Sequence, residues 1–150
     1  MPSFRTSHVV RHTRDQMFDL VADVPSYPQF VPLCRSIRVK RRFHAADGTE
    51  VFVSEMEVGY KAVREKFTSR VVLNRSAHRI DVTYVDGPFS HLENRWTFAE
   101  AGPGACRVEF FIAYEFRSRM LATLMGSMFD VAFRKFTSAF EARADQIFGL

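Results

Sequence analysis

The sequence is poor in the residues and motifs that build common metal, nucleotide and hydrolase sites. Its two cysteines, Cys34 and Cys106, form no CxxC pair and have no suitably placed histidines to complete a zinc site. No HxH, HExxH or GxSxG motif is present, and the Gly-Pro pairs at 87–88 and 102–103 are typical of turns rather than phosphate-binding loops. We therefore expect no metal, no required cofactor and no catalytic residue, and the cysteine content favours a reducing cytoplasm.

Long apolar runs are also missing. Charged residues such as Arg5, Arg11 and Arg14 interrupt the first twenty positions, so no signal-peptide run is present there. No window approaches the roughly 20 apolar residues that cross a bilayer, so we expect any membrane contact to be peripheral, on the inner face of the cell membrane. The formal net charge of +4 permits contact with anionic lipid or RNA but does not require it.

Phenylalanine, by contrast, is abundant. The chain has 16 Phe against 4 Tyr and 1 Trp, and 47% of its residues are hydrophobic. Phenylalanine buries a large surface and carries no polar group, so this excess is typical either of a thick core or of a cavity for an apolar ligand. Composition alone leaves both open. The length of 150 residues, without repeats or linkers, predicts one domain spanning 1–150.

Period-two alternation predicts seven β-strands joined mostly by short turns, as in an antiparallel meander. The predicted strands are 3–11, 36–43, 51–58, 64–74, 78–85, 92–98 and 107–116. In the second strand we place Ile37, Val39 and Phe43 on one face. Gly59 predicts a break or bulge after the third strand.

Two helical regions flank the predicted meander. Thr13 and Gln16 have the spacing of a capping box, and Pro25 ends the short helix that follows, so 24–33 is expected to be a loop or one short turn. Residues 118–148 predict a long amphipathic helix. Its apolar stripe consists of Met125, Phe129, Phe133, Phe136, Phe140, Ala144 and Ile147. The element order is therefore strand, short helices, six strands and a long helix that covers the sheet.

A basic cluster lies on the second predicted strand. Its members are Arg35, Arg38, Lys40, Arg41 and Arg42. Five cations in eight residues could contact phosphate or anionic lipid head groups, or could simply protect a sheet edge and keep the protein in solution. The sequence has no DNA-binding motif with interleaved surface aromatics, so we expect no DNA partner.

Three stretches together resemble the coenzyme Q-binding START-domain family. They are "VADVPSYPQFVPLCRSIRV" at 21–39, "DGPFSHLENRWTF" at 86–98 and "FDVAFRKFTSAFEARADQI" at 129–147. The resemblance implies an α+β helix-grip fold (START/Bet v 1-like), a curved seven-stranded antiparallel sheet around the C-terminal helix, with a tunnel between them. It also implies that ubiquinone or a similar polyprenyl lipid is bound without being chemically changed, as by a quinone chaperone supporting respiration or quinone biosynthesis.

Bacterial relatives of this family are also labelled ribosome-association toxin or polyketide cyclase. The toxin label implies binding to the large ribosomal subunit, with the basic strand residues Arg35, Arg38, Lys40 and Arg42 as the anionic-surface contact. The cyclase label implies an acid–base enzyme. The sequence offers no convincing dyad for it, and His78, Glu55 and Tyr114 are its main candidates.

Given this resemblance, we predict which residues line the tunnel. The proline-stiffened stretch that contains Tyr27, Phe30, Val31, Pro32 and Leu33 would line or gate one end, although it could instead only plug the end of the sheet. A preordered apolar wall would lower the entropic cost of ligand capture. The remaining predicted contacts are a second rim at Pro88 and Phe89, strand residues Trp96, Phe110, Ile112 and Tyr114, and helix residues Met125, Phe129, Phe133 and Phe136.

Overall fold

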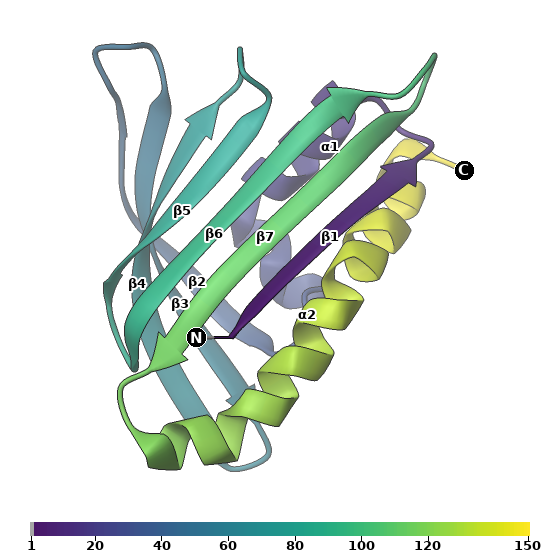
Figure 1. The fold of residues 1–150 in the computed structure, drawn as a ribbon. Helices are drawn as coiled ribbons and strands as arrows, with labels where there is room; N and C mark the ends of the chain where they lie inside the picture. Colours follow the sequence, from purple (N-terminus) through teal and green to yellow (C-terminus); the bar gives the residue numbers. More distant parts are fainter. Residues whose placement is uncertain (1) are drawn as a thin grey trace.

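A computed structural model describes residues 2–150 and contains one antiparallel sheet, two α-helices and one short 3₁₀ helix. Figure 1 shows the sheet curving around the long C-terminal helix. The elements are β1 (Ser3–Val10), α1 (Arg14–Ala22), η1 (Val24–Gln29), β2 (Cys34–His44), β3 (Glu50–Tyr60), β4 (Val63–Asn74), β5 (Arg79–Asp86), β6 (Phe89–Glu100), β7 (Cys106–Phe116) and α2 (Arg119–Phe148).

The seven strands are ordered β1-β7-β6-β5-β4-β3-β2. Strands β2 to β7 form a meander in which each strand pairs antiparallel with the next, and β1 completes the sheet by pairing with β7. The two edges are therefore β1 and the basic strand β2. The predicted helix-grip architecture is confirmed. No helix within residues 2–150 has the length and apolarity needed to cross a bilayer.

The connection from β1 to β2 follows the predicted local signals. The Thr13 hydroxyl accepts a hydrogen bond from the Gln16 amide, and the Gln16 side chain accepts one from the Thr13 amide, which completes the capping box of α1. After α1 the chain forms η1, with Pro25 at its start and Pro28 inside it. The stretch 24–33 is thus one short helical segment followed by a turn, as expected.

Strand β2 departs from the predicted alternation. A register shift between Val39 and Arg41 inserts one extra residue opposite β3, which is a β-bulge. Beyond the bulge the faces are exchanged, so Phe43 pairs with Val51 on the face opposite to Ile37 and Val39. The prediction that these three residues share a face was therefore wrong.

Gly59 also behaves differently from the prediction. It remains within β3 and pairs with Arg64, and the chain turns only after Tyr60. Its amide donates a hydrogen bond to the carbonyl oxygen of Leu33, 3.0 Å away. A Cβ atom at this position would lie 3.3 Å from the side chain of Arg35, so glycine permits a close approach between β3 and the end of the proline-rich loop.

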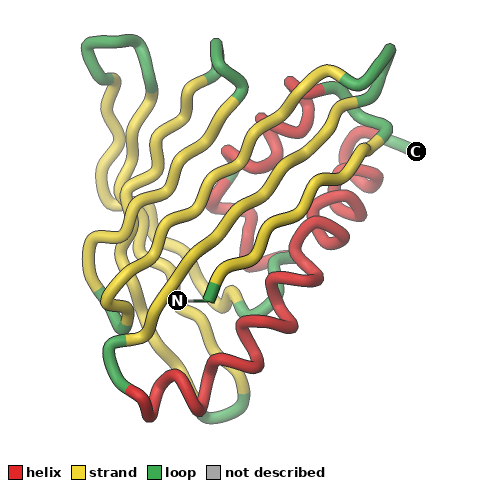
Figure 2. The backbone as a smooth tube through the Cα atoms, in the orientation of Figure 1, coloured by secondary structure: helices red, strands yellow, loops and turns green. Residues whose placement is uncertain are grey.

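Helix α2 lies across the concave face of the sheet, as the tube view in Figure 2 shows. The Ser118 hydroxyl caps its first turn by accepting from the Leu121 amide. The predicted stripe is buried or half-buried with one exception: Ile147 is exposed, and the neighbouring Phe148 packs against the core instead, beside the ring of His12. The stripe therefore drifts by one position at the end of the helix.

Side-chain polar contacts between α2 and the rest of the described chain lie near its C-terminal end. His8 on β1 pairs with Glu141 at 2.8 Å, and the buried His12 pairs with Asp145 at 2.6 Å. A third contact joins Arg143 to Gln29 of η1 at 2.8 Å. The half of α2 nearer its N-terminus packs against the sheet through apolar side chains.

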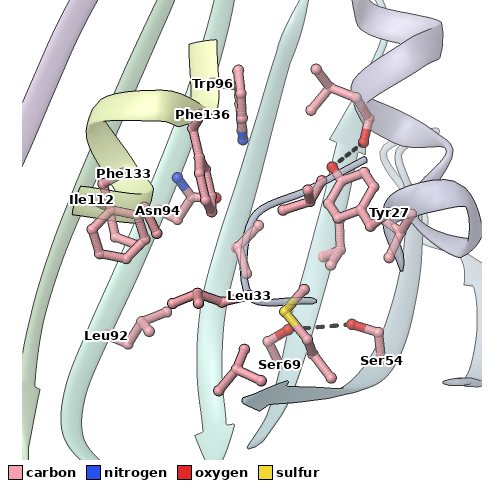
Figure 3. A pocket seen from close by; sticks show the side chains of 18 of the residues that line it. Tyr27, Leu33, Ser54, Ser69, Leu92, Asn94, Trp96, Ile112, Phe133 and Phe136 are labelled. Carbon is pink, nitrogen blue, oxygen red and sulfur yellow. Dashed lines mark hydrogen bonds between the residues drawn. The ribbon is translucent and has the colours of Figure 1, made fainter. Parts of the chain in front are cut away.

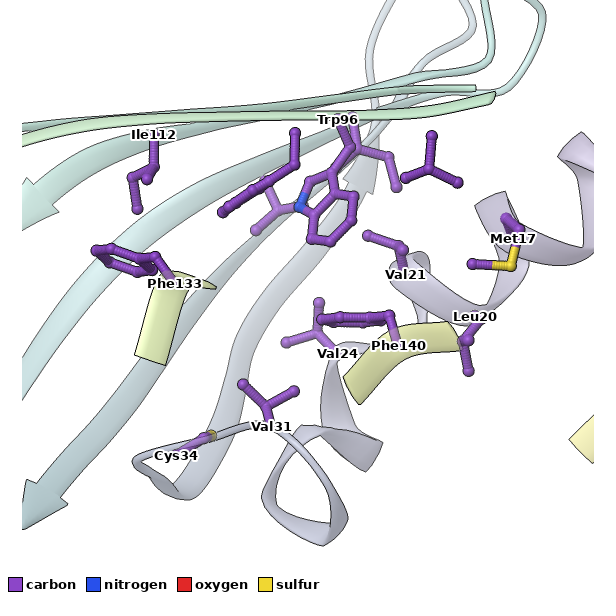
Figure 4. Packing of buried hydrophobic residues seen from close by; sticks show 14 of the residues in the cluster. Met17, Leu20, Val21, Val24, Val31, Cys34, Trp96, Ile112, Phe133 and Phe140 are labelled. Atoms are coloured by element: carbon purple, nitrogen blue, oxygen red, sulfur yellow. The ribbon is translucent and has the colours of Figure 1, made fainter. Parts of the chain in front are cut away.

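Part of the hydrophobic core lies where α1 meets α2. Figure 4 shows Met17, Leu20 and Val21 of α1 beside Phe140 of α2, below the indole of Trp96. The rings of Phe140 and Trp96 are 4.9 Å apart and nearly edge to face. Side chains of α1, α2 and β6 therefore pack together at this end of the space between sheet and helix.

Candidate functional site

A cavity of about 110 Å³ lies between the concave face of the sheet and α2. Its lining, part of which is shown in Figure 3, is almost entirely apolar and includes no charged side chain. The lining residues are Val21, Val24, Tyr27, Val31, Pro32, Leu33, Ser54, Met56, Val58, Phe67, Ser69, Val71, Ile80, Val82, Leu92, Asn94, Trp96, Ile112, Phe129, Ala132, Phe133, Phe136 and Phe140. We call this space the inner cavity.

The sheet wall of the inner cavity is built by every second residue of adjacent strands. Residues paired across neighbouring strands share a face, so Ser54 of β3 lies beside Ser69 of β4, and Val82 of β5 beside Asn94 of β6. Helix α2 supplies the opposite wall through aromatic side chains spaced three or four residues apart. The inner cavity therefore lies between a sheet face formed by every second strand residue and a helix face formed by residues three or four apart.

Polar groups are few within this lining. The hydroxyls of Ser54 and Ser69 are 3.3 Å apart and form one hydrogen bond. The amide nitrogen of Asn94 donates to the carbonyl oxygen of Phe111 at 2.8 Å. The Tyr27 hydroxyl donates to the carbonyl oxygen of Val21, and burial raises the pKa of Tyr27 far above its ordinary value, so this phenol stays neutral.

A second hollow adjoins the inner cavity on its outer side. This outer groove, of about 310 Å³, is lined by Pro32, Leu33, Tyr60, Ser127, Met128, Val131, Ala132 and Lys135. It shares Pro32, Leu33 and Ala132 with the inner cavity, so these three residues form the boundary between the two spaces. Leu33 has φ of 67°, a left-handed backbone conformation that is unfavourable for a leucine.

Nine of the fifteen residues predicted to contact a ligand line the inner cavity. They are Tyr27, Val31, Pro32, Leu33, Trp96, Ile112, Phe129, Phe133 and Phe136. Four residues of the proline-rich loop therefore border the cavity, and whether the loop gates it stays a prediction. The other six, Phe30, Pro88, Phe89, Phe110, Tyr114 and Met125, are outside its lining.

Those six residues instead build the packed surroundings. Phe89 is fully buried and forms an aromatic cluster with Phe116 and Tyr114, which fills the far end of the sheet. Phe110 is covered by Trp96 and Phe136. These residues were assigned to the lining because they lie on the concave face, but other aromatic rings cover them.

The other three residues, Pro88, Phe30 and Met125, lie outside the cavity lining for different reasons. Pro88 is buried in the turn before β6, and its carbonyl oxygen accepts from the Arg117 amide. Phe30 packs edge to face on Phe140, with the Arg143 guanidinium 5.3 Å from its ring centre. Met125 is buried in the hydrophobic core outside the lining. The predicted second rim at 88–89 is therefore closed.

The prediction also missed much of the sheet wall. Period-two alternation puts Phe67, Ser69 and Val71 on one face of β4, and Ile80 and Val82 on one face of β5. That signal was sufficient to include these residues. Ser54 and Asn94 were harder to find, because a polar residue on an inward face is not distinguishable in one sequence from a solvated one.

The basic residues of β2 lie on an edge strand of the sheet, and none of them lines the inner cavity. Lys40 pairs with Glu55 at 3.2 Å and Arg42 with Glu50 at 2.8 Å, both on the neighbouring strand. Within residues 2–150 no acidic side chain lies within ion-pair distance of Arg35 or Arg38. The strand therefore offers fewer free cations than the sequence suggests.

The residues considered for acid–base chemistry are not gathered at the cavity. His78 pairs with Asp15 of α1 at 2.9 Å, and Glu55 lies outside the lining beside Lys40, which lowers the pKa of that carboxyl. Tyr114 is buried among Phe129 and Phe133. Across residues 2–150, no three metal-binding side chains come together.

Comparisons with known sequences place these features in a family. The family model described as polyketide cyclase / dehydrase and lipid transport matches residues 10–141. The ribosome association toxin RatA of Rickettsia prowazekii is 33% identical over 150 residues, covering 98% of this chain and 99% of that protein. The mitochondrial coenzyme Q-binding protein COQ10 homolog B of Xenopus laevis is 32% identical, covering 97% of this chain and 59% of that protein.

Solved structures agree with these sequence matches. An 18 kDa protein from Caulobacter crescentus is 37% identical, with full coverage of both chains and a TM-score of 0.80. The Zhui aromatase/cyclase from a Streptomyces species has a TM-score of 0.79 over 97% of this chain and 94% of its own, but its 14% identity shows the fold alone. The chain therefore belongs to the polyketide cyclase / dehydrase and lipid transport family.

Proposed function

We propose that the protein binds ubiquinone, or a similar polyprenyl lipid, and presents it to respiratory or quinone-biosynthesis proteins without changing it chemically. The observation that carries this proposal is a cavity without charged side chains, between the sheet and α2, that adjoins an outer groove with mostly apolar lining residues. A ligand that fits both spaces needs a compact neutral head and a long apolar tail. The name of the Xenopus relative, a coenzyme Q-binding protein, points to the same ligand class.

The sizes of the two spaces suggest how such a lipid would lie. An apolar cavity of roughly 150 Å³ is sufficient to bind benzene, so the inner cavity, at about 110 Å³, is of the order of one six-membered ring. The tail would then pass Leu33 and Ala132 into the outer groove. Each buried methylene of the tail contributes about 0.8 kcal/mol, so a few isoprene units are enough for micromolar affinity.

The surface around the outer groove suits contact with an anionic bilayer. Met120, Leu124 and Val131 follow one face of α2 and are 69%, 49% and 51% exposed. Lys135 lines the groove near them, and Lys61 lies over the exposed ring of Tyr60 on the opposite rim. An apolar patch with a basic border is the pattern expected for peripheral binding to acidic lipids, and here it would place the groove against the lipid source.

The lining argues against acid–base catalysis at this site. It contains no Asp, Glu, His, Lys or Cys, and its one phenol, Tyr27, already donates its proton to a backbone carbonyl. A cyclase needs a group that exchanges a proton near neutral pH within reach of the substrate. We therefore favour a binding role over an enzymatic one.

The test is lipid analysis combined with fluorescence. Protein purified from a quinone-producing host should release a quinone into organic solvent, detected by mass spectrometry. Added short-tail ubiquinone should quench Trp96, the single tryptophan of the chain, because that indole lines the cavity. Absence of both co-purified quinone and quenching would refute the proposal.

Ribosome association is the second candidate, because the RatA relative is matched along almost its whole length. The contact surface would be the β2 edge with Arg35 and Arg38, which have no acidic partner in the described chain. Co-sedimentation with large ribosomal subunits should then be lost in an Arg35→Glu/Arg38→Glu variant and fall steeply with salt. Co-sedimentation that survives charge reversal would exclude this surface.

A further inference from the structure

We infer that Asn94 and Trp96 form a paired hydrogen-bonding site for a hydroxyl group on the ligand head, so that the protein prefers a hydroquinone to the corresponding quinone. The inference rests on the proposed function, because it concerns the head of the same lipid. It adds the chemical state of that head, which neither the cavity volume nor the family determines.

The two side chains are placed together by β6. Positions 94 and 96 lie on the same face of the strand, and both residues line the inner cavity. In Figure 3 the indole nitrogen of Trp96 points toward the Asn94 amide along one wall of the cavity. Their Cα partners on β7, Ile112 and Phe110, have apolar side chains, so Asn94 and Trp96 supply the polar atoms of this part of the wall.

The orientation of the Asn94 amide is fixed. One N–H of its nitrogen donates to the Phe111 carbonyl oxygen, which sets the direction of the amide, and no donor of the described chain reaches the Oδ1 atom. Asn94 thus presents a hydrogen-bond acceptor, and Trp96, whose Nε1 can only donate, presents a donor.

Both groups lack partners within the described chain. The fully buried side-chain atoms without a partner are Thr6 Oγ1 and Arg143 Nε, so neither Asn94 Oδ1 nor Trp96 Nε1 is sealed inside packed protein. Each instead borders the open space of the cavity. Polar groups in such a position are costly unless something hydrogen-bonds to them, and an apolar residue would fill a purely structural role better.

The donor–acceptor combination selects among neutral heads. A quinone carbonyl can accept from Trp96 but leaves the Asn94 oxygen unpaired, because a quinone has no donor. A hydroquinone hydroxyl can accept from Trp96 and donate to Asn94 at the same time. The Ser54–Ser69 pair does not discriminate, since each hydroxyl can donate or accept. A carboxylate or phosphate head is unsuited to the site, because no cation lines it.

The test compares both redox states of one short-tail ubiquinone by calorimetry under anaerobic conditions. The wild-type protein should bind the quinol about 3- to 10-fold more tightly, the effect of one additional neutral hydrogen bond. A tenfold preference would also raise the midpoint potential of the bound couple by about 30 mV.

Variants separate the two hydrogen bonds. Asn94→Leu should weaken quinol binding until the two forms bind equally, whereas Trp96→Phe should weaken both forms and keep the quinol preference. Glu93→Gln is the control, because Glu93 neighbours Asn94 on β6 but is exposed and lies outside the cavity lining, so it should leave both affinities unchanged. A thermal melt shows whether each variant is folded.

The outcomes are distinguishable. Equal affinity of the wild-type protein for quinol and quinone would overturn the inference and leave the proposed lipid binding intact, independently of any variant. A preference that persists in a folded Asn94→Leu variant would also overturn it. Binding of neither form would refute the proposed function itself.

Discussion

Replacement of Ala132 by phenylalanine should separate stability from ligand binding. Ala132 is buried on α2 and borders both the inner cavity and the outer groove, so a larger side chain would enter the boundary between them. In a solid interior this change would be strongly destabilising. In a hollow one it places a ring where we expect the head of the lipid to bind.

The magnitude follows from the volume of the cavity. At about 24 cal/mol per Å³ an unfilled cavity of about 110 Å³ costs about 2.6 kcal/mol. Filling it with a phenyl ring recovers part of that amount, and the imperfect fit costs about 1–3 kcal/mol. The two effects offset each other, so we expect the free energy of unfolding of Ala132→Phe to lie within about 1.5 kcal/mol of the wild-type value.

The assay combines urea unfolding with quenching of Trp96 by added ubiquinone. Ala132→Phe should unfold near the wild-type midpoint but show quinone affinity reduced at least about tenfold, a binding loss of 1.4 kcal/mol or more. Ala142→Phe, at an exposed position of the same helix, is the control and should change neither measurement. Destabilisation of Ala132→Phe by more than 4 kcal/mol, or quenching that is unaffected, would refute the interpretation of this space as a binding cavity.

Three further predictions concern stability. Ser54→Ala and Ser69→Ala should each destabilise by about 1–3 kcal/mol, because each leaves one hydroxyl without its partner, whereas the double variant should cost less than the sum in urea titrations. Gly87→Ala should be severely destabilising in thermal melts, because its φ is +146° and a Cβ would lie 2.6 Å from a side-chain atom of β4. Gly102→Ala, with a φ of +109° but open space around it, should cost the backbone strain without the clash and so destabilise less. Burial raises the pKa of Cys34 from 9.0 to about 12, so the free energy of unfolding should fall as pH rises through this interval, since the unfolded thiol ionises first; a Cys34→Ala variant with the same pH profile would contradict this.

Most of the fold was predictable because its signals are local and repeated. Alternation fixed the strands, the Thr13–Gln16 capping box began α1, and the apolar stripe gave the length of α2. The errors occurred where a single residue shifts the periodic pattern of inward-facing and outward-facing side chains. The bulge after Val39 reversed the face of Phe43. Arg41 interrupts the apolar alternation at this point, but the interruption alone does not show that a residue is inserted.

The site was less predictable than the fold. Periodicity shows which residues face inward, but whether an inward side chain lines a cavity or is covered by another ring depends on packing across the sheet. Phe110 and Phe136 are both aromatic and both concave-facing, yet only Phe136 reaches the open space. Asn94 could not be recognised as a hydrogen-bond acceptor from the sequence. The direction of its amide depends on a hydrogen bond to the backbone of a neighbouring strand.

The uneven attachment of α2 determines how a guest could be admitted. The directional contacts with His8, His12 and Gln29 all come from residues 141–145, whereas the turns beside the outer groove are held by non-directional apolar contacts that can slide without breaking a specific bond. We expect the turns of α2 beside the outer groove to open locally more readily than the turns around Ala144, while Arg117 and Ser118 still tether the start of the helix to β7. Amide hydrogens in its first turns should accordingly exchange with solvent sooner than those near Ala144.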